Sequence, residues 1–330
     1  MAETTAEAFA LDAKDRRILY ELDRDARQSF RAIGKKAGLG KEVAAYRVAR
    51  LLERGVVKGF HAVIDLSKLG YTSYRAYFRL SETSPAEEAE ILRELAGRKD
   101  VWWLCSFNGT WDVALGSWVR SGYEFERTWK AILRKYRGKI SEEKISVHQY
   151  IYQFPRAYLS GREKRLEAAI VTGGEERAEC DGLDFAILGA VAADGRAPTV
   201  EIGKKVGAAP TVVAYRLKKL EERGIIKGYR ATVDLAKLGV LWYKLVFTLN
   251  SFERRGEMMK WARAHPRVTW AFDSLGGWDV EMEVEVPSVA AVRRVFDEFR
   301  AAFSKDIRSA DYFEIYGEHK IAYMPAKPPQ

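Results

Sequence analysis

The sequence predicts an α+β protein with two winged helix-turn-helix domains and two ferredoxin-like (βαββαβ) domains, arranged in tandem. Three observations lead to this fold class. The sequence contains an internal repeat of two copies. Each copy begins with three short helical patterns and continues with alternating strands and helices. At 330 residues, the chain is long enough for two to four domains.

The two halves of the chain align with each other. Without a gap, Asp15–Leu19 falls on Asp184–Leu188 and Val43–Phe60 falls on Val212–Tyr229, and the match resumes further on, at GTWDV and GGWDV. The repeat spans roughly 11–158 and 181–324. Such a period is too long for a solenoid, so each copy must form one or two complete domains.

The repeat and the turn signals set the predicted domain boundaries. The helix-turn-helix domains are expected at 11–65 and 181–235, and the ferredoxin-like domains at 66–158 and 236–330. The segment 159–180 is charged and contains a Gly-Gly pair, which is typical of a linker. Its middle is compatible with a short helix.

Apolar spacing predicts the three helices of each helix-turn-helix domain. In the first copy they cover 15–22, 30–37 and 41–54, and the extended runs 56–59 and 61–65 are expected to form a two-stranded wing. The second helix ends at Gly38, a usual residue after a helix. On the third helix we expect one inward face and one outward face. The inward residues are Val43, Val48 and Leu51, and the outward residues are Glu42, Ala45, Tyr46 and Ala49.

The rest of each copy predicts a split βαβ order. The strands of the first copy are expected near 72–80, 101–107, 111–119 and 144–153, with helices near 86–98 and 122–136. Those of the second copy are expected near 241–249, 268–274, 278–286 and 308–316, with helices near 254–264 and 288–302. Helices cover only one sheet face in this arrangement. The other face carries Tyr77, Trp103, Phe107 and Trp118, so it needs a covering partner.

Charge and composition narrow the function classes. The net charge of +9 and pI of about 9.3 favour nucleic acid as a partner. No apolar run approaches the roughly 18 residues of a membrane span, and the acidic start of the chain lacks the apolar core of a signal peptide. Cys105 and Cys180 lie far apart, which fits a reducing cytoplasm.

A family resemblance follows from these motifs. The string I-G-K-K-x-G, then Y-R-x-x-x-L-x-E-R-G-x-x-K-G and D-L-x-K-L-G, closely resembles the N-terminal half of Lrp/AsnC transcription regulators. The βαββαβ unit with G-x-W-D-V resembles their ligand-sensing RAM domain. The resemblance implies sequence-specific binding to double-stranded DNA by a dimer whose RAM sheets pack face to face. Here one chain supplies both partners as an intramolecular pseudo-dimer, and further homo-oligomerisation is compatible with the sequence.

Candidate DNA-contacting residues lie on the second and third helices of each helix-turn-helix domain. A helix in the major groove reads base edges with residues near its N-terminus. The predicted contacts on the third helices are Lys41, Glu42, Ala45, Tyr46, Pro210, Thr211, Ala214, Tyr215 and Lys218. The candidate phosphate-binding cations are Lys35, Lys36, Arg47, Arg50, Lys204, Lys205, Arg216 and Lys219.

Alternatives stand beside these roles. The whole set can be a solvated face, with the tyrosines leaning onto the first helix. Arg47 and Arg216 can equally form salt bridges with Asp15 or Asp184. The resemblance also breaks at one point, because Gly40 and the alanine at position 209 occupy the usual serine N-cap position. Alanine caps poorly, so the case for the second domain is weaker.

The turn between the two middle strands carries a second candidate site. In the family this region borders the cleft for an amino-acid effector, and exposed amides and a carboxylate can hold an amino acid. Ordinary hairpin chemistry, with Trp111 and Trp278 in the core, explains the same pattern. The candidate effector-binding residues are Asn108, Gly109, Thr110, Asp112, Ser274, Gly276, Gly277 and Asp279.

An enzyme is the rival interpretation. No metal-ligand spacing, catalytic set or phosphate loop is present, so we expect no metal, no cofactor and no catalytic residues. Sirohaem decarboxylases resemble Lrp/AsnC proteins in fold and occur as paired or fused subunits. That family carries a His-Asn-Tyr-x-Arg stretch where this chain has VWWLCSFNGTWDVALG and VTWAFDSLGGWDVEME, without the His or Arg. An adaptor that senses an effector without binding DNA is the third alternative.

Overall fold

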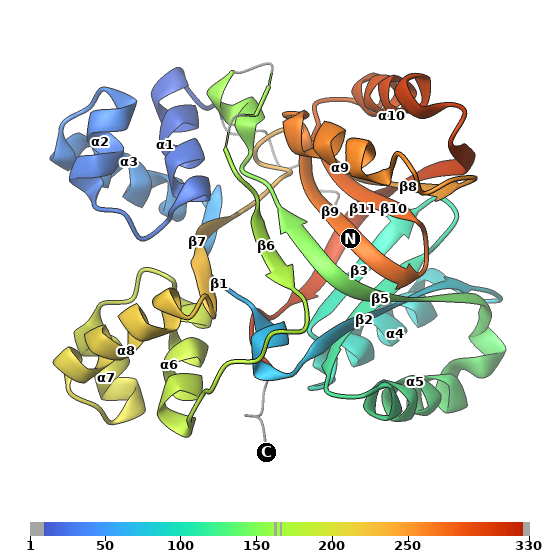
Figure 1. Ribbon diagram of the computed structural model, residues 1–330, viewed down its shortest axis with the longest axis horizontal. Coiled ribbons are helices and arrows are strands. Elements are labelled where there is room, and N and C mark those ends of the chain that lie inside the picture. Colours follow the sequence, from blue (N-terminus) through green and yellow to red (C-terminus); the bar gives the residue numbers. More distant parts are fainter. Residues whose placement is uncertain (1–9, 162–163, 166, 326–330) are drawn as a thin grey trace.

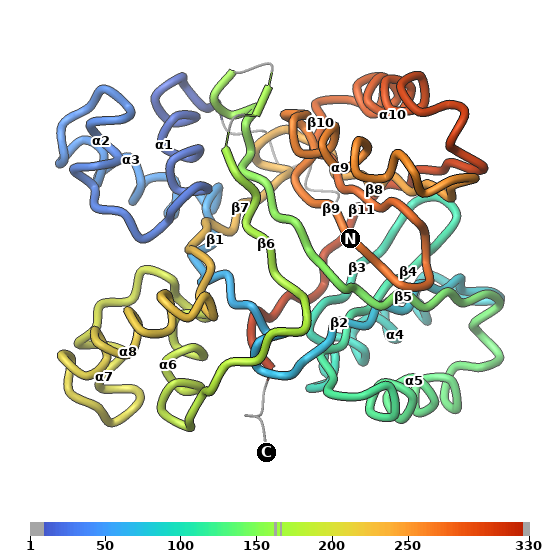
Figure 2. The backbone as a smooth tube through the Cα atoms, viewed as in Figure 1, coloured from blue at the N-terminus to red at the C-terminus, as the bar shows by residue number. Residues whose placement is uncertain are grey.

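The computed structural model describes residues 10–161, 164–165 and 167–325. Two small helical domains lie on one side of the molecule, and a large sheet structure with its helices lies on the other (Figures 1 and 2). No described helix combines the length and hydrophobicity needed to cross a membrane. The predicted α+β fold class is confirmed.

Each helical domain, called a head below, contains three helices. Aspartates begin the first helix of each head, because the side chains of Asp12 and Asp181 accept hydrogen bonds from backbone N–H groups of the first turn. Residues from both heads merge into a single hydrophobic core. The helices are α1 (Ala13–Arg24), α2 (Phe30–Ala37) and α3 (Lys41–Glu53) in head one, and α6 (Gly182–Ala193), α7 (Thr199–Val206) and α8 (Pro210–Glu222) in head two.

The strand that follows each head pairs with the corresponding strand of the other copy. The runs expected to form a two-stranded wing in head one are one continuous strand, β1 (Val57–Ile64). It pairs antiparallel with β7 (Ile226–Val233) of the second copy, in a separate two-stranded ribbon. The prediction that these two runs pair with each other as a wing was wrong, because the pairing partner is far away in the sequence.

The βαββαβ units follow the predicted order. Within each unit the last strand pairs with the first, giving β5-β2-β4-β3 and β11-β8-β10-β9, the order of a ferredoxin-like sheet. A short 3₁₀ turn, η1 (Leu66–Leu69), precedes unit one. Unit one contains β2 (Thr72–Leu80), α4 (Pro85–Gly97), β3 (Trp103–Asn108), β4 (Val113–Val119), α5 (Gly122–Tyr136), η2 (Arg137–Lys139) and β5 (Ile140–Gln153). Unit two contains β8 (Leu241–Leu249), α9 (Arg255–Ala264), β9 (Val268–Gly276), β10 (Val280–Val286), α10 (Val289–Phe303) and β11 (Ile307–Ile321).

The last strand of each unit joins the two units. The first part of β5 pairs with β2, and its second part crosses to β9 of unit two. In the same way β11 pairs first with β8 and then with β3 of unit one. The strands therefore close into a ring, called the barrel below. This double pairing explains why β11 ends after the range expected from a single unit, because its last residues pair with β3. The early start of β5 has another cause, since its first residues pair with the end of β2 in the same unit.

Each sheet has one face under helices and one face toward the other unit. Helices α4 and α5 pack on unit one, and α9 and α10 pack on unit two. Between the sheets, Tyr77, Trp103 and Phe107 are buried together with Val246 and Phe313 of unit two. Three of the four aromatic residues that needed a covering partner are therefore covered from within the same chain, whereas Trp118 is half-buried and packs against the core shared by the heads.

The connection between the copies carries structure of its own. It contains η3 (Ala157–Ser160) and β6 (Ile170–Gly173). Strand β6 pairs with the end of β5, so part of the expected linker extends the sheet where a short helix had been considered.

Candidate nucleic-acid interface

A close backbone approach fixes the turn between the second and third helices. A Cβ on Gly34 would lie 2.7 Å from the carbonyl oxygen of Leu39, and a Cβ on Gly203 would lie 2.5 Å from that of Ala208. Both contacts are too short for any side chain. The glycine of the I-G-K-K motif therefore lets the turn pack onto the second helix, which sets the position of the third.

The third helices turn the predicted faces to solvent. The side chain of Tyr46 is 67% exposed and that of Tyr215 is 60% exposed, so neither leans onto the first helix. The inward face of α3 differs from the prediction at one position: Val43 is 46% exposed, and Ala44 is buried in its place. Its repeat partner Val212 is also exposed. Sequence reasoning missed both valines, although an exposed methyl group near a helix N-terminus suits contact with thymine.

The start of each third helix has no side-chain cap. Neither the glycine before Lys41 nor the alanine before Pro210 caps the first turn. Lys41, Glu42, Pro210 and Thr211 are all exposed there. The free backbone N–H groups at such an end favour a nearby phosphate.

All three candidate phosphate-binding arginines are held by carboxylates of their own head. Arg47 contacts Asp12 at 2.7 Å and Asp15 at 2.8 Å, and Arg216 contacts Asp184 at 3.2 Å. The hydrogen bond from Arg47 holds the pKa of Asp12 below its usual value. Arg50 also pairs with Asp15, at 2.7 Å. These arginines tie the third helix to the first, which favours the salt-bridge alternative.

The candidate lysines divide into paired and unpaired groups. Lys36 contacts Glu21 at 3.1 Å, Lys41 contacts Glu42 at 3.4 Å, and both Lys218 and Lys219 contact Glu222. Within the described ranges, Lys35, Lys204 and Lys205 are exposed and have no ion-pair partner. The same holds for Arg31 on α2, which sequence reasoning missed. This second set is the one most available to phosphates.

The two heads are locked to each other by reciprocal contacts. Arg27 of head one donates to the carbonyl oxygen of Gly195 at 2.7 Å, and Arg196 of head two donates to the carbonyl oxygens of Ala26 and Gln28. The guanidinium groups also lie over aromatic rings of the shared ribbon, Tyr229 and Phe60 respectively. Together with the common core, these contacts fix the spacing of α3 and α8.

The residues of the candidate effector turn have internal roles. Asp112 accepts a hydrogen bond from the backbone N–H of Leu80 at 2.7 Å, and Asp279 accepts one from Leu249 at 2.7 Å. Across the seam between the units, Asn108 donates to Glu314, and Thr110 donates to Asp311.

The glycines of the same turn allow a close approach between the units. A Cβ on Gly109 would lie 2.7 Å from Cβ of Phe313, and one on Gly276 would lie 2.8 Å from the carbonyl oxygen of Ile145. A Cβ on Gly277 would lie 2.9 Å from Ser146. Ser274 has a buried hydroxyl without a partner among the described residues. Packing between the units therefore explains most of the candidate effector residues in the β3–β4 and β9–β10 turns without a ligand.

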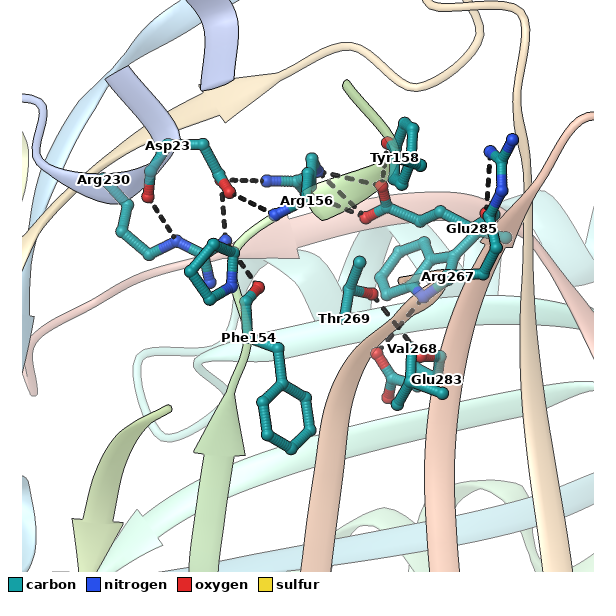
Figure 3. A network of polar contacts seen from close by, with 12 residues as sticks. Asp23, Phe154, Arg156, Tyr158, Arg230, Arg267, Val268, Thr269, Glu283 and Glu285 are labelled. Atoms are coloured by element: carbon teal, nitrogen blue, oxygen red, sulfur yellow. Dashed lines mark hydrogen bonds and ion pairs between the residues drawn. The ribbon is translucent and has the colours of Figure 1, made fainter. Parts of the chain in front are cut away.

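A buried polar network connects head one to the sheet structure (Figure 3). Asp23 of α1 contacts both Arg230 of β7 and Arg156, which follows β5, at 2.6 Å. Arg156 also contacts Glu285 of β10 at 2.8 Å, and Tyr158 donates to the same carboxylate. Burial would raise the pKa of Asp23, but the two guanidinium groups more than offset it and hold the pKa low.

Family models match both heads. Residues 11–52 match the AsnC-type helix-turn-helix domain, and residues 181–227 match a winged helix-turn-helix DNA-binding model. An uncharacterised HTH-type transcriptional regulator of Pyrococcus furiosus is 30% identical over 132 residues, which make up 39% of this chain and 85% of that protein. The chain belongs to the Lrp/AsnC family.

The lengths of other relatives of this Lrp/AsnC chain correspond to one copy of its repeat. The proline dehydrogenase transcriptional activator of Rhodobacter capsulatus is 29% identical over 135 residues, which cover 40% of this chain and 88% of that protein. These relatives thus match at nearly full length while occupying less than half of this chain. The fold of the siroheme decarboxylase NirDL covers 95% of this chain and 94% of its own, with a TM-score of 0.64 at 12% identity. That likeness concerns the fold alone.

Proposed function

We propose that this protein is a transcription regulator that binds double-stranded DNA with both heads, in the cytoplasm, and is not an enzyme. The observation that carries the proposal is the pair of exposed third helices on one shared core. A rigid pair of such helices suits two successive major-groove half-sites. The unpaired lysines beside them are placed to neutralise phosphates.

The two βαββαβ units act in this proposal as the intramolecular dimerisation module. In the dimers of the family two chains supply the two RAM sheets, whereas here a single chain does so. The internal roles of Asp112 and Asp279 argue against a free amino-acid cleft at the β3–β4 and β9–β10 turns. If an effector acts at those turns, it competes with these hydrogen bonds. Further assembly of whole chains is compatible with the proposal.

Electrophoretic mobility shifts with selected duplex DNA test the proposal. Affinity is expected to fall by about three to five decades between about 50 and 200 mM salt, provided six to ten phosphates are neutralised. Replacing Lys35 and Lys204 by Gln should weaken binding and reduce the salt slope by about 0.9 for each phosphate that is no longer neutralised. The matched control replaces Lys130 and Lys260, which lie on barrel helices, and should bind as the wild type does. Absence of binding at low salt would refute the proposal.

The fold shared with a siroheme decarboxylase supports an enzyme as the second candidate. The sequence lacks the His and Arg of that family's motif on β3 and β9. A visible absorption spectrum after addition of sirohaem discriminates the two. A shifted band followed by loss of carboxylate groups from the tetrapyrrole would establish the enzyme.

A further inference from the structure

A cavity of about 790 Å³ lies between the β1–β7 ribbon and the adjacent end of the barrel. Its walls come from both copies of the repeat. The ribbon contributes residues near His61 and Arg230, and the barrel contributes residues of all its strands, β2–β5 and β8–β11. Its size lies within the range of small-molecule sites. None of the candidate effector residues lines it, although Asn108 donates to Glu314 in its wall, and the exposed faces of α3 and α8 lie outside it.

The cavity walls are rich in indole rings. Five of the nine tryptophans of the chain line it. Trp102 and Trp118 stack on each other with their ring centroids 4.9 Å apart. The other three are Trp103, Trp242 and Trp270, and only Trp103 among the five is fully buried. The faces of such rings are electron-rich, so they attract flat apolar molecules and, above all, cations.

Among the described residues, every lysine and arginine that lines the cavity is already neutralised. Arg75 contacts Glu283 at 3.5 Å, and Lys58 contacts Asp234 at 3.3 Å. Arg156 and Arg230 share Asp23, as described above. Arg75 also lies over the ring of Trp103, at 4.0 Å from the ring centroid. This lining therefore offers no free positive charge to an anionic ligand.

Carboxylates outnumber cations in the same lining, by five to four. Within the described part of the chain, Glu314 and Glu318 of β11 have no cation in ion-pair contact. Glu314 is occupied by the Asn108 amide, whereas Glu318 is accessible and lines the cavity. Desolvation by the cavity walls outweighs the attraction of Lys58 and raises the pKa of Glu318 to about 7. A second acceptor, Oε1 of Gln153, is buried in the lining without a donor among the described residues.

We propose that this cavity is a binding site for a planar aromatic cation, held between the tryptophan rings with its positive charge toward Glu318. Indole faces and a carboxylate without an ion-pair partner select the same ligand chemistry, a delocalised positive charge on a flat ring system. N–H groups on such a ring also supply the donor that Gln153 lacks. The site is independent of DNA binding and stands whether or not the heads bind DNA.

Three ring-matched probes test the charge selection on the full chain. Proflavine is a three-ring cation, acridone is uncharged, and anthracene-2-sulfonate is an anion. Titration calorimetry at about pH 8, where Glu318 is ionised, should rank them as cation, neutral, anion. Quenching of tryptophan fluorescence should accompany binding. Equal or tighter binding of the anion would overturn the proposal, and so would failure of proflavine to bind.

Two variants locate the site. Glu318→Gln should weaken proflavine binding roughly tenfold and leave acridone binding unchanged. Glu142→Gln on β5 removes the same charge from an exposed position outside the cavity and should change neither. Retained acridone binding shows that Glu318→Gln is folded. Unchanged proflavine binding by that variant would overturn the proposal.

Discussion

Arg230 donates to Asp23 Oδ1 at 2.6 Å, although the two residues belong to different copies of the repeat. Arg156 contacts the same oxygen from the end of β5. In the aligned positions of the other copy, Ala192 replaces Asp23 and His61 replaces Arg230. The charged network therefore ties head one, and not head two, to the sheet structure through this pair of positions.

Removal of the Asp23 charge should destabilise the protein strongly. In Asp23→Asn, two buried guanidinium groups lose their shared carboxylate, so we expect the free energy of unfolding to fall by about 3–5 kcal/mol. Urea denaturation at neutral pH measures the loss. Asp297→Asn breaks only exposed ion pairs on α10 and should cost under about 1 kcal/mol. Equal costs for the two variants would contradict this role of the network.

Stability should decrease as the pH falls below 6.5. Burial, aided by Arg230 and Arg156, lowers the pKa of His61 to about 3, and burial lowers the pKa of His265 to about 4. Between those values and the unfolded value of about 6.5, the unfolded chain binds protons that the folded chain excludes. In that range each such histidine lowers the free energy of unfolding by about 1.4 kcal/mol for each unit by which the pH falls.

Urea denaturation at about pH 7.5 and about pH 5 tests this dependence. In His61→Asn, the loss of stability between the two pH values should be smaller than in wild type by about 2 kcal/mol. Asparagine preserves a polar group toward Thr232 Oγ1, which lies 2.9 Å from Nδ1 of the histidine. An identical loss in the variant and the wild type would show that His61 does not contribute.

The two βαββαβ units should prefer each other to copies of themselves. Strand β10 buries Glu281, Glu283 and Glu285 between the sheets, and unit one supplies Arg75 and Arg156 to the last two. Two copies of unit two would bury these carboxylates without those arginines. Fragments 66–158 and 236–330, mixed at micromolar concentration, should sediment as a heterodimer. Stronger self-association of 236–330, with both fragments folded, would contradict this expectation.

The preferred DNA site should be asymmetric. Lys41 and Glu42 can hydrogen-bond base edges, whereas Pro210 cannot, and Thr211 offers a hydroxyl and a methyl group. Binding-site selection on the wild type should return two different half-sites with centres about one helical turn, or a multiple, apart. Exchanging Lys41-Glu42 for Pro-Thr should make the site more symmetric and weaken binding by about 1–3 kcal/mol for each base hydrogen-bonded in the wild type. Two equal inverted halves for the wild type would refute the prediction.

Local patterns predicted the elements better than their partners. The spacing of apolar residues located the helices and strands because each element buries one face of its own. The pairing of β1 with β7 was out of reach, because an extended run looks the same whichever strand it joins. Val43 was misplaced for a subtler reason: on α3 the small Ala44 fills the inward position, and size gave no hint of burial.

In the candidate site too, local features were predictable from the sequence and long-range contacts were not. The outward tyrosines and the glycine turn followed from periodicity and from the motif, whereas the salt bridges of Arg47 depend on how α1 crosses α3. The Asp23 network joins residues of α1, β7 and β10 with Arg156 after β5, and no spacing in the sequence relates them. The sequence analysis did not single out these positions; the one signal that could have done so is the difference between the copies, such as Arg230 opposite a histidine.

The ribbon of β1 and β7 has a consequence for how the protein can evolve. Each of its strands comes from a different copy, and both are always made together, so their pairing does not depend on the cellular concentration of the protein. A related regulator in the same cell would have to displace a tethered strand to form a mixed dimer. A mutation in one reading helix also stays in that helix and is not doubled by symmetry. The fusion thus keeps the strand pairing within one chain, and under the proposed function it allows selection to change the preference of each reading helix separately.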